Sequence, residues 1–345
     1  DFIGFTGSDR VGKMVMKRAA ETLTPVSLEL GGKDPMIVMD GSNIERAANA
    51  AAFGGMMNSG QICMSVERIY VEEPAYDEFV TRLTDSVKEL RQGPDKIAGE
   101  SEVGAMTTPT QTEHVEKQVN EAISQGARAL TGGKRVDGPG DYYEPTVLVD
   151  VDHSMSVMRD ETFGPVVGVM KVKDTEEAVQ LSNDTRYGLS GTVFGPGKKA
   201  EEVARRIECG AVNVNSVLFN FLAPGVPMGG WKESGIGYRH AEYGIRKYCR
   251  SEAIVSARLL TKSELIWYPY TPERRALVGR LGNFLGARGL KRFRKRVAMS
   301  LPYGTDWSFS SAVAHASHDL HLLGLVPWPW RSAELTEVMI HNPAS

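Results

Sequence analysis

Cysteine is scarce in this chain of 345 residues, which holds only Cys63, Cys209 and Cys249. Three thiols at such wide spacing form neither a disulfide framework nor a recognisable zinc motif. The sequence is therefore unlike that of the small secreted proteins that depend on disulfides. We expect the chain to work in a reducing compartment, the cytoplasm.

Long apolar runs and a strong net charge are also missing. No stretch is long enough to predict a transmembrane helix. The formal net charge of −3 excludes nucleic-acid binding by overall charge. The sequence also lacks an initial methionine: it starts at Asp1 and enters the strand-like run Phe2-Ile3-Gly4-Phe5 at once. We therefore expect that it is part of a longer protein, with sequence missing upstream.

What the chain does contain, up to about residue 258, is an alternation of strand and helix patterns that predicts an α/β fold. Apolar residues at helical spacing predict helices over 11–22, 43–57, 74–90, 110–125 and 175–183. Short apolar runs predict strands over 2–5, 26–30, 35–39, 67–72, 129–131, 146–149, 166–172, 191–194, 212–215 and 254–258. A capping box, Ser42-x-x-Glu45, is expected to start the second helix.

The composition changes after residue 258. From 258 to 296 the sequence has 11 Lys or Arg residues against 2 Asp or Glu, a net charge of +9. One face of an expected basic helix is apolar and comprises Leu277, Leu281, Phe284 and Leu285. We favour a solvated or packing helix over weak contact with an anionic membrane surface. Residues 297–345 are expected to be loosely structured, and their His315, His318 and His321 drift around a helix without forming a metal site.

Cys63 is the candidate nucleophile. It lies in Gly60-Gln61-Ile62-Cys63, a turn that exposes the sulfur and leaves room for an electrophile. The thiolate is the reactive form of such a side chain. A buried structural cysteine is the alternative, and the local sequence leaves both open. Cys209 and Cys249 lie in amphipathic surroundings, which favour structural roles.

Glu29 is the candidate general base. It ends an apolar strand in Leu28-Glu29-Leu30-Gly31-Gly32-Lys33, where an unpaired carboxylate is costly. Desolvation there would raise its pKa towards the range that suits a base. The alternative is a salt bridge, for example to Lys33, with Gly31-Gly32 as an ordinary tight turn.

Two further segments are ambiguous by themselves. Asp160-Glu161-Thr162-Phe163-Gly164-Pro165 could hold a ribose with its carboxylate and pack its ring on a flat group, or it could be a strand-entry turn. The segment 227–237 is rich in glycine, which indicates close backbone approach or simply a loop.

The order and spacing of the motifs closely resemble the aldehyde dehydrogenase superfamily. The motifs are Phe5-Thr6-Gly7-Ser8, the Glu29 motif, the Cys63 motif 34 residues later, the Glu161 motif, the segment 183–189 and the loop 229–237. The resemblance covers about residues 1–258. It implies an aldehyde dehydrogenase-like α/β fold, in which a catalytic domain follows a truncated Rossmann-type cofactor domain.

The resemblance also implies domain boundaries. Residues 1–31 would be the end of the cofactor-binding domain and 32–233 the catalytic domain. Residues 234–258 would hold a return helix and an oligomerisation strand, and 259–345 the basic extension. A strand over 249–258 that crosses to a neighbouring subunit implies a homodimer or homotetramer, with an internal edge strand as the alternative.

By the same resemblance, Cys63 attacks the aldehyde carbonyl to give a thiohemiacetal, and hydride transfer to NAD or NADP leaves a thioester. Glu29 then activates the water that hydrolyses this thioester to a carboxylic acid. Family members that pass the acyl group to coenzyme A usually lack this glutamate. The alternative is a catalytically silent member with a scaffold or binding role.

The resemblance also implies the cofactor contacts. Glu161 would hold the nicotinamide ribose with Phe163 beside the ring, Gly7 and Ser8 would lie near the diphosphate at a helix N-terminus, and the Leu30 backbone would face the nicotinamide. The family's oxyanion asparagine and its lysine for the adenosine ribose have no counterpart here. We therefore expect this polypeptide alone to bind cofactor poorly and to be inactive.

The expected substrate contacts are Ile62, Met64, Leu222 and Met228. These side chains are apolar and no cation accompanies them. They predict an aliphatic or aromatic aldehyde, not succinate semialdehyde, which would need an arginine or lysine.

Overall fold

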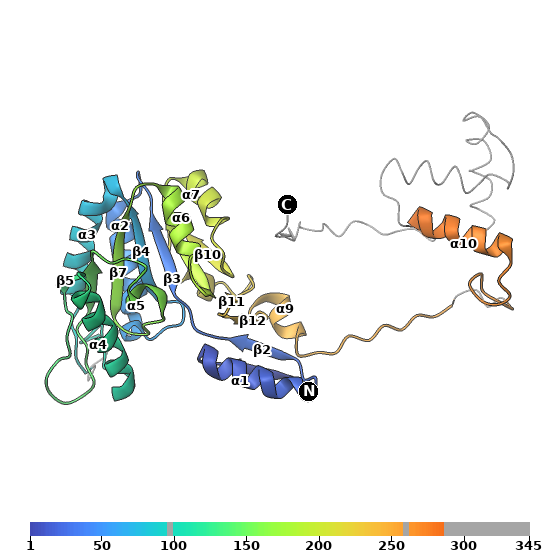
Figure 1. Ribbon diagram of the computed structural model, residues 1–345, viewed down its shortest axis with the longest axis horizontal. Helices are drawn as coiled ribbons and strands as arrows, with labels where there is room; N and C mark the ends of the chain where they lie inside the picture. The colour runs from blue at the N-terminus through green and yellow to red at the C-terminus, as the bar shows by residue number, and fades with distance from the viewer. Residues whose placement is uncertain (95–98, 258–261, 286–345) are drawn as a thin grey trace. The chain divides into compact units, whose positions relative to one another are not determined.

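The computed structural model describes residues 1–94, 99–257 and 262–285, and the chain divides into two compact units, Asp1–Ser251 and Glu252–Ser345 (Figure 1). The first unit contains every strand of the described chain. The second contributes one described helix, α10 (Pro272–Leu285). The expected tail over 297–345 and its histidines lie outside the described residues.

A seven-stranded sheet forms the centre of the first unit, in the order β10-β9-β3-β4-β7-β6-β5. Its strands are β3 (Asp34–Val38), β4 (Val66–Glu72), β5 (Arg128–Thr131), β6 (Thr146–Val149), β7 (Val166–Val172), β9 (Ser190–Phe194) and β10 (Ala211–Val214). All neighbours pair in parallel except β5 with β6. The α/β prediction is confirmed, and strand burial on both faces explains why β7 reads as one apolar run.

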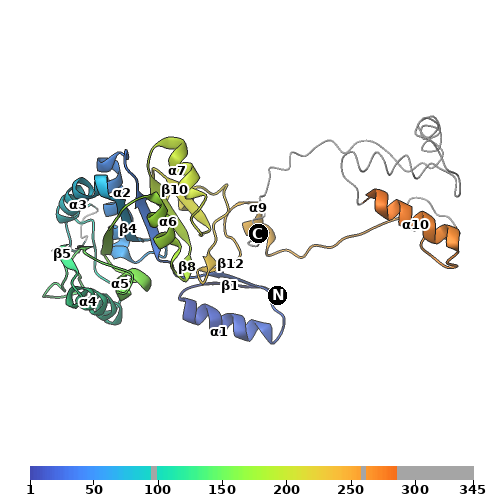
Figure 2. The same ribbon diagram turned by 45° about the horizontal axis from the view of Figure 1, so that its top comes forward.

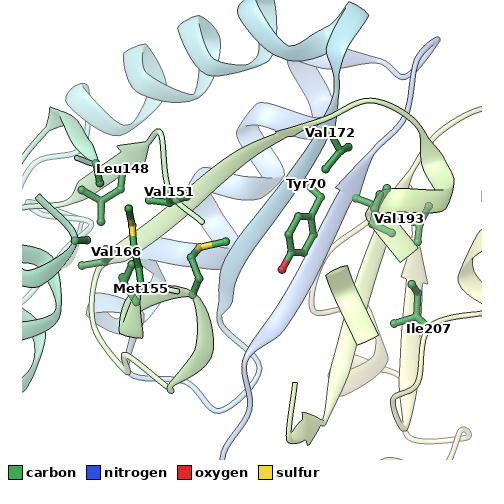
Figure 3. Close-up of a cluster of buried hydrophobic side chains, with 14 of the residues drawn as sticks. Tyr70, Leu148, Val151, Met155, Val166, Val172, Val193 and Ile207 are labelled. Atoms are coloured by element: carbon green, nitrogen blue, oxygen red, sulfur yellow. The ribbon is translucent and has the colours of Figure 1, made fainter. Parts of the chain in front are cut away.

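Helices cover both faces of this sheet (Figure 1). One face packs on α2 (Ile44–Met56) and α3 (Glu73–Lys88). The other packs on α4 (Pro109–Ser124), α5 (Ser156–Arg159), α6 (Thr175–Asn183) and α7 (Gly197–Ala204). Successive side chains of β3 enter opposite clusters: Met36 and Val38 face α2 and α3, whereas Ile37 and Met39 face the other helices. Figure 3 shows the second cluster, with Tyr70 of β4 and Val193 of β9 among its members.

A second, small sheet carries the Glu29 motif. Strands β1 (Ile3–Thr6) and β2 (Val26–Glu29) pair in parallel and are joined by α1 (Asp9–Ala20), which lies alongside them in Figure 2. Strand β12 (Gly235–Ile236) adds to β2 in antiparallel fashion. The remaining elements are the 3-10 turn η1 (Met57–Gly60), β8 (Tyr187–Gly188), α8 (Phe219–Leu222), β11 (Trp231–Lys232) and α9 (Ala241–Arg246).

Two local predictions are wrong. The side chain that caps α2 is Asn43, whose Oδ1 accepts from Arg46 N, while the Ser42 hydroxyl donates to the Met39 carbonyl instead. The strand expected over 254–258 does not form in its described part, up to residue 257. Ile254 and Val255 are 83 % and 93 % exposed.

The helix predicted in the basic segment does form, as α10. Its Leu277, Leu281 and Leu285 are exposed, so within the described residues this apolar face is not part of a packed core. Across the described ranges, none of the helices is both long and apolar enough to cross a bilayer.

Truncating a buried side chain of α3 should lower the free energy of unfolding more than truncating an exposed side chain of α2. Phe79 is 0 % exposed, so Phe79→Ala should lower the free energy of unfolding by about 3–5 kcal/mol through lost burial and a cavity. The matched control is Phe53→Ala on α2, which is 55 % exposed and should change it by less than about 1 kcal/mol. Urea denaturation followed by circular dichroism measures both. Equal losses would contradict the placement of Phe79 in the core.

Candidate active site

Glu29 ends β2, and the next four residues form the buried turn that leads into β3. The turn is fixed by Ser234, whose carbonyl accepts from Leu30 N at 2.9 Å. A Cβ on Gly32 would lie 2.2 Å from the Cys63 carbonyl oxygen, so only glycine allows this contact. The turn after Glu29 therefore touches the backbone of Cys63.

The segment before Cys63 is unusually bent. Asn58, Ser59 and Gly60 have φ angles of 52°, 57° and 68°, three consecutive left-handed residues between α2 and the nucleophile candidate. A Cβ on Gly60 would lie 1.9 Å from the Gly164 carbonyl oxygen. The Cys63 loop is thus packed against the end of the Glu161 motif.

The Glu161 side chain closes the arrangement. Its Oε1 accepts from Gly32 N at 3.0 Å, and a Cβ on Gly31 would lie 2.5 Å from its Oε2. Burial raises the pKa of Glu161 to about 7, with a further contribution from Glu67. The three motifs, remote in sequence, thus meet at the Gly31-Gly32 turn.

Glu29 is buried and its Oε1 has no hydrogen-bond partner among the residues that the structure describes. Burial raises its pKa to about 7, against the opposing charges of Arg239 and Lys247. The salt bridge to Lys33 that the sequence left open is not formed, because the Lys33 ammonium pairs with Glu67. Glu29 is therefore a buried carboxyl group that titrates near neutral pH.

The Cys63 thiol is only partly accessible. Burial raises its pKa to about 11, and the carboxyl groups of Asp34, Glu161 and Glu29 raise it further in the same direction. At neutral pH the group is a thiol, and reaction requires a base to remove its proton. Cys209 is buried with a pKa of about 12, while Cys249 is exposed.

Apolar side chains gather beside Cys63. Met64 and Met228 are buried together with Leu189 and Leu218, and Ile62, Cys63 and Val217 pack on them. Three of the four expected substrate contacts are thus in one cluster with the thiol. Leu222 is not: it is 69 % exposed, on α8, and does not belong to the cluster.

The expected diphosphate turn lies at the start of α1. The Ser8 hydroxyl caps this helix by accepting from Val11 N at 3.4 Å. Gly7 N donates to the Glu29 carbonyl at 3.1 Å, which places the turn beside the end of β2. The Leu30 side chain packs under α1, where a Cβ on Gly12 would come within 2.5 Å of it.

Sequence reasoning missed the buried charges next to these motifs. Lys33 and Glu67 form an ion pair at 2.5 Å with side chains 0 % and 2 % exposed, and Asp34 accepts from Ser190 N at 3.1 Å. Burial raises the pKa of Asp34 to about 8. The available signal was a set of charged residues at the ends of otherwise apolar strands, since such residues are rarely buried without partners. Within the described ranges, no group of His, Cys, Asp or Glu could hold a metal ion.

The chain is similar to known proteins in both sequence and structure. Residues 1–254 match the family model described as the aldehyde dehydrogenase family. A Mycobacterium ulcerans (strain Agy99) protein, named provisionally as succinate-semialdehyde dehydrogenase [NADP(+)] 2, is 39% identical over 81% of this chain and 54% of its own length. The 4,4'-diapolycopene aldehyde oxidase of Methylomonas sp is 39% identical over 79% of this chain and 50% of its own length.

Solved structures agree with the sequence matches. The betaine aldehyde dehydrogenase of Staphylococcus aureus, in complex with NAD+, has a TM-score of 0.68 at 37% identity and covers 72% of this chain and 50% of that one. The chain spans about half the length of the curated relatives it matches.

The acidic surroundings of Cys63 predict its reactivity. Glu161→Gln removes one of the carboxyl groups that raise the thiol pKa, so Cys63 should be alkylated about 3–10-fold faster at pH 8. Iodoacetamide labelling read by peptide mass spectrometry measures this. Cys249 is the internal control, because it is exposed and its rate should not change. An unchanged Cys63 rate would show that Glu161 does not act on the thiol.

Proposed function

The chain belongs to the aldehyde dehydrogenase family, and from that premise we propose that it oxidises an aldehyde to a carboxylic acid with NAD+ or NADP+, using Cys63 as nucleophile and Glu29 as base. One observation carries the proposal. Glu29 has a buried oxygen without a partner, in a turn whose Gly32 touches the backbone of Cys63. A nucleophile and a base on adjoining loops suit covalent catalysis in two stages.

In the first stage the Cys63 thiol gives up its proton to solvent, the resulting thiolate adds to the aldehyde carbon, and the carbonyl oxygen becomes the oxyanion of a thiohemiacetal. The backbone N–H of Cys63 is a donor available to that oxygen. The dinucleotide, when bound, supplies the acceptor for the hydride that leaves the same carbon. The product on the protein is an acyl thioester at Cys63.

In the second stage Glu29 takes a proton from water, whose oxygen attacks the thioester carbon. The carbon–sulfur bond breaks, the acid leaves and the sulfur regains a proton. A base works best when its pKa is close to the working pH, and the value of about 7 for Glu29 meets that condition. Net water addition to the acyl group accounts for the second oxygen of the acid.

The cofactor contacts are proposed for residues that fit such a ligand. Glu161 presents a partly buried carboxylate against the Gly31-Gly32 turn, suited to two ribose hydroxyls. Gly7 and Ser8 lie at the N-terminus of α1, where backbone dipoles favour a diphosphate, and Phe163 and the Leu30 backbone would flank the nicotinamide. The relatives named above include one with NADP(+) and one with NAD+, and both cofactors stay open here.

The substrate proposal follows from the apolar cluster of Met64, Leu189, Leu218 and Met228 beside Cys63. It favours an aliphatic or aromatic aldehyde, because a charged chain would lose its hydration there without gaining a counter-ion. The relatives are named for succinate semialdehyde, diapolycopene aldehyde and betaine aldehyde, so their names do not agree on one substrate class.

The base role of Glu29 can be tested without any cofactor. An activated ester, p-nitrophenyl acetate, acylates a reactive thiol directly to the same kind of thioester. Wild-type protein should turn it over, with a deacylation rate that rises with pH through about 7, since only the ionised carboxyl group accepts a proton. Glu29→Gln should slow deacylation by about 10²–10⁴-fold, lose that pH dependence and retain the acetyl group on Cys63.

Mass spectrometry of the trapped protein and stopped-flow release of nitrophenolate measure both stages. Cys209→Ser is the control and should behave as wild type, because that thiol is buried in a different hydrophobic cluster from Cys63. Normal turnover by Glu29→Gln would remove the base from the proposal. A wild-type protein that is never acylated at Cys63 would favour the alternative, a silent member with a binding role.

Substrate preference gives a second test. With the whole protein, kcat/KM for hexanal and benzaldehyde should exceed that for succinate semialdehyde by at least about 10-fold, the discrimination expected from a site that leaves a carboxylate unpaired. Dinucleotide reduction at 340 nm follows the reaction. A clear preference for succinate semialdehyde would overturn the apolar-substrate proposal while leaving the chemistry at Cys63 intact.

A further inference from the structure

Glu67 is a buried carboxylate in the middle of the main sheet. It lies at an irregularity of β4: Asp34 pairs with Val66, but the next residue, Pro35, pairs with Arg68. Glu67 is therefore the extra residue of a bulge between β3 and β4. Bulges re-aim a side chain that would otherwise follow the regular alternation of the strand.

The carboxylate of Glu67 is saturated with donors. Oε1 accepts from Phe163 N at 2.8 Å, and Oε2 accepts from Thr162 N at 2.8 Å. Oε2 also pairs with the Lys33 ammonium, which donates in turn to the Thr162 hydroxyl at 2.9 Å. Buried charges persist only with such partners, so these contacts fix the position of the Glu67 side chain.

The segment that Glu67 binds is strained. Phe163 has a φ of 49°, in the left-handed region that an aromatic residue rarely adopts. Such a conformation persists where several contacts determine it together. Besides the two backbone N–H groups held by Glu67, the carbonyls of Thr162 and Phe163 both accept from the Gln111 amide.

Glu161 directly precedes Thr162 and the strained Phe163, and its carboxylate accepts a hydrogen bond from Gly32 N. Lys33, the next residue after Gly32, carries the ammonium that Glu67 holds. One carboxylate thus joins two loops: the Glu161 loop through backbone N–H groups and the Glu29 turn through Lys33.

We infer that Glu67 is a positioning residue that holds Thr162 and the strained Phe163 in place and thereby keeps the Glu161 carboxylate against the Gly31-Gly32 turn. It touches neither substrate nor cofactor in the proposed reaction. The role of Glu67 bears on dinucleotide binding, because Glu161 is the proposed contact of the ribose. The inference therefore rests on the proposed function. The polar ligand recognised there is a vicinal diol.

The competing view is that Lys33 and Glu67 are only a stabilising ion pair. Losing one partner of a buried pair is strongly destabilising, whereas neutralising both is often tolerated. Lys33→Met combined with Glu67→Gln removes both charges of this pair and should unfold closer to wild type than Lys33→Met alone. The glutamine has one oxygen where the carboxylate has two. An NH2 donor replaces the Oε2 acceptor of Thr162 N, and only the longer contact of 3.2 Å from Thr162 N to Oε1 is left beside the one from Phe163 N, so positioning stays impaired. The double variant therefore separates stability from positioning.

The first readout needs no cofactor. Hydrogen–deuterium exchange, resolved to residues 161–163, should be at least about 10-fold faster in Glu67→Gln and in the double variant, the factor for loss of one hydrogen bond of about 1.4 kcal/mol. Glu72→Gln is the matched control: this glutamate ends the same strand, is buried and accepts from Asp40 N at 2.7 Å, away from Phe163. Its exchange at 161–163 should not change.

The second readout is the calorimetric affinity of the whole protein for NAD+ and NADP+. The dissociation constant should rise about 10-fold or more in the Glu67→Gln and double variants but not in Glu72→Gln, while nitrophenyl acetate turnover changes less than about 3-fold. Unchanged exchange at 161–163 would overturn the inference, and so would faster exchange with unchanged affinity. If wild-type protein binds neither dinucleotide, the cofactor part of the proposed function fails, and the exchange result still decides whether Glu67 holds the segment.

Discussion

The close approach of two backbones at Gly32 is the constraint on which the candidate site depends. The Cys63 carbonyl occupies the space that any Cβ would need, and the Gly32 N–H binds the Glu161 carboxylate. A larger residue would have to separate Glu29, Cys63 and Glu161 at once. The neighbouring Gly31 lies similarly close to the Glu161 carboxylate. Because neither glycine has a side chain, the three loops can come into direct contact.

This compactness has an electrostatic consequence. Cys63, Glu29 and Glu161 are partly or fully withdrawn from water, and every ionisable group near the thiol in this set is acidic. The arrangement disfavours the thiolate and raises the pKa of both carboxyl groups to about 7. Each of these shifts would be reduced by a cation in the site. The oxidised nicotinamide ring is cationic, so the acidity that keeps the thiol protonated also favours that ligand.

The sequence predicted those parts of the fold that local pattern controls. The seven main strands follow from apolar runs and turn residues, and the site motifs follow from their spacing. The sequence did not predict the contacts that depend on which strands pair and how the chain turns. Lys33 binds Glu67 and not Glu29 because β3 lies beside β4, where a bulge aims Glu67 inward. Ser42 and Asn43 are both good caps, and only the geometry of the turn selects Asn43. Ile254 and Val255 have strand-like sequence, but strand formation needs a neighbour that the sequence pattern cannot supply.

The candidate site lies where the ends of the two sheets meet. In open parallel sheets, ligands usually bind beyond the carboxyl ends of the strands. The small sheet obeys this rule: Gly7 follows β1, Glu29 ends β2, and the N-terminus of α1 lies beside them. The main sheet does the opposite, since Cys63 and Glu161 precede the amino ends of β4 and β7. Each sheet thus contributes to both proposed roles: the base candidate Glu29 and the diphosphate turn lie at the end of the small sheet, and Cys63 and the ribose candidate Glu161 lie before strands of the main sheet. The two sheets meet in the turn from Glu29 to β3, which is why the base candidate lies at that junction, next to the buried charges of Lys33 and Glu67.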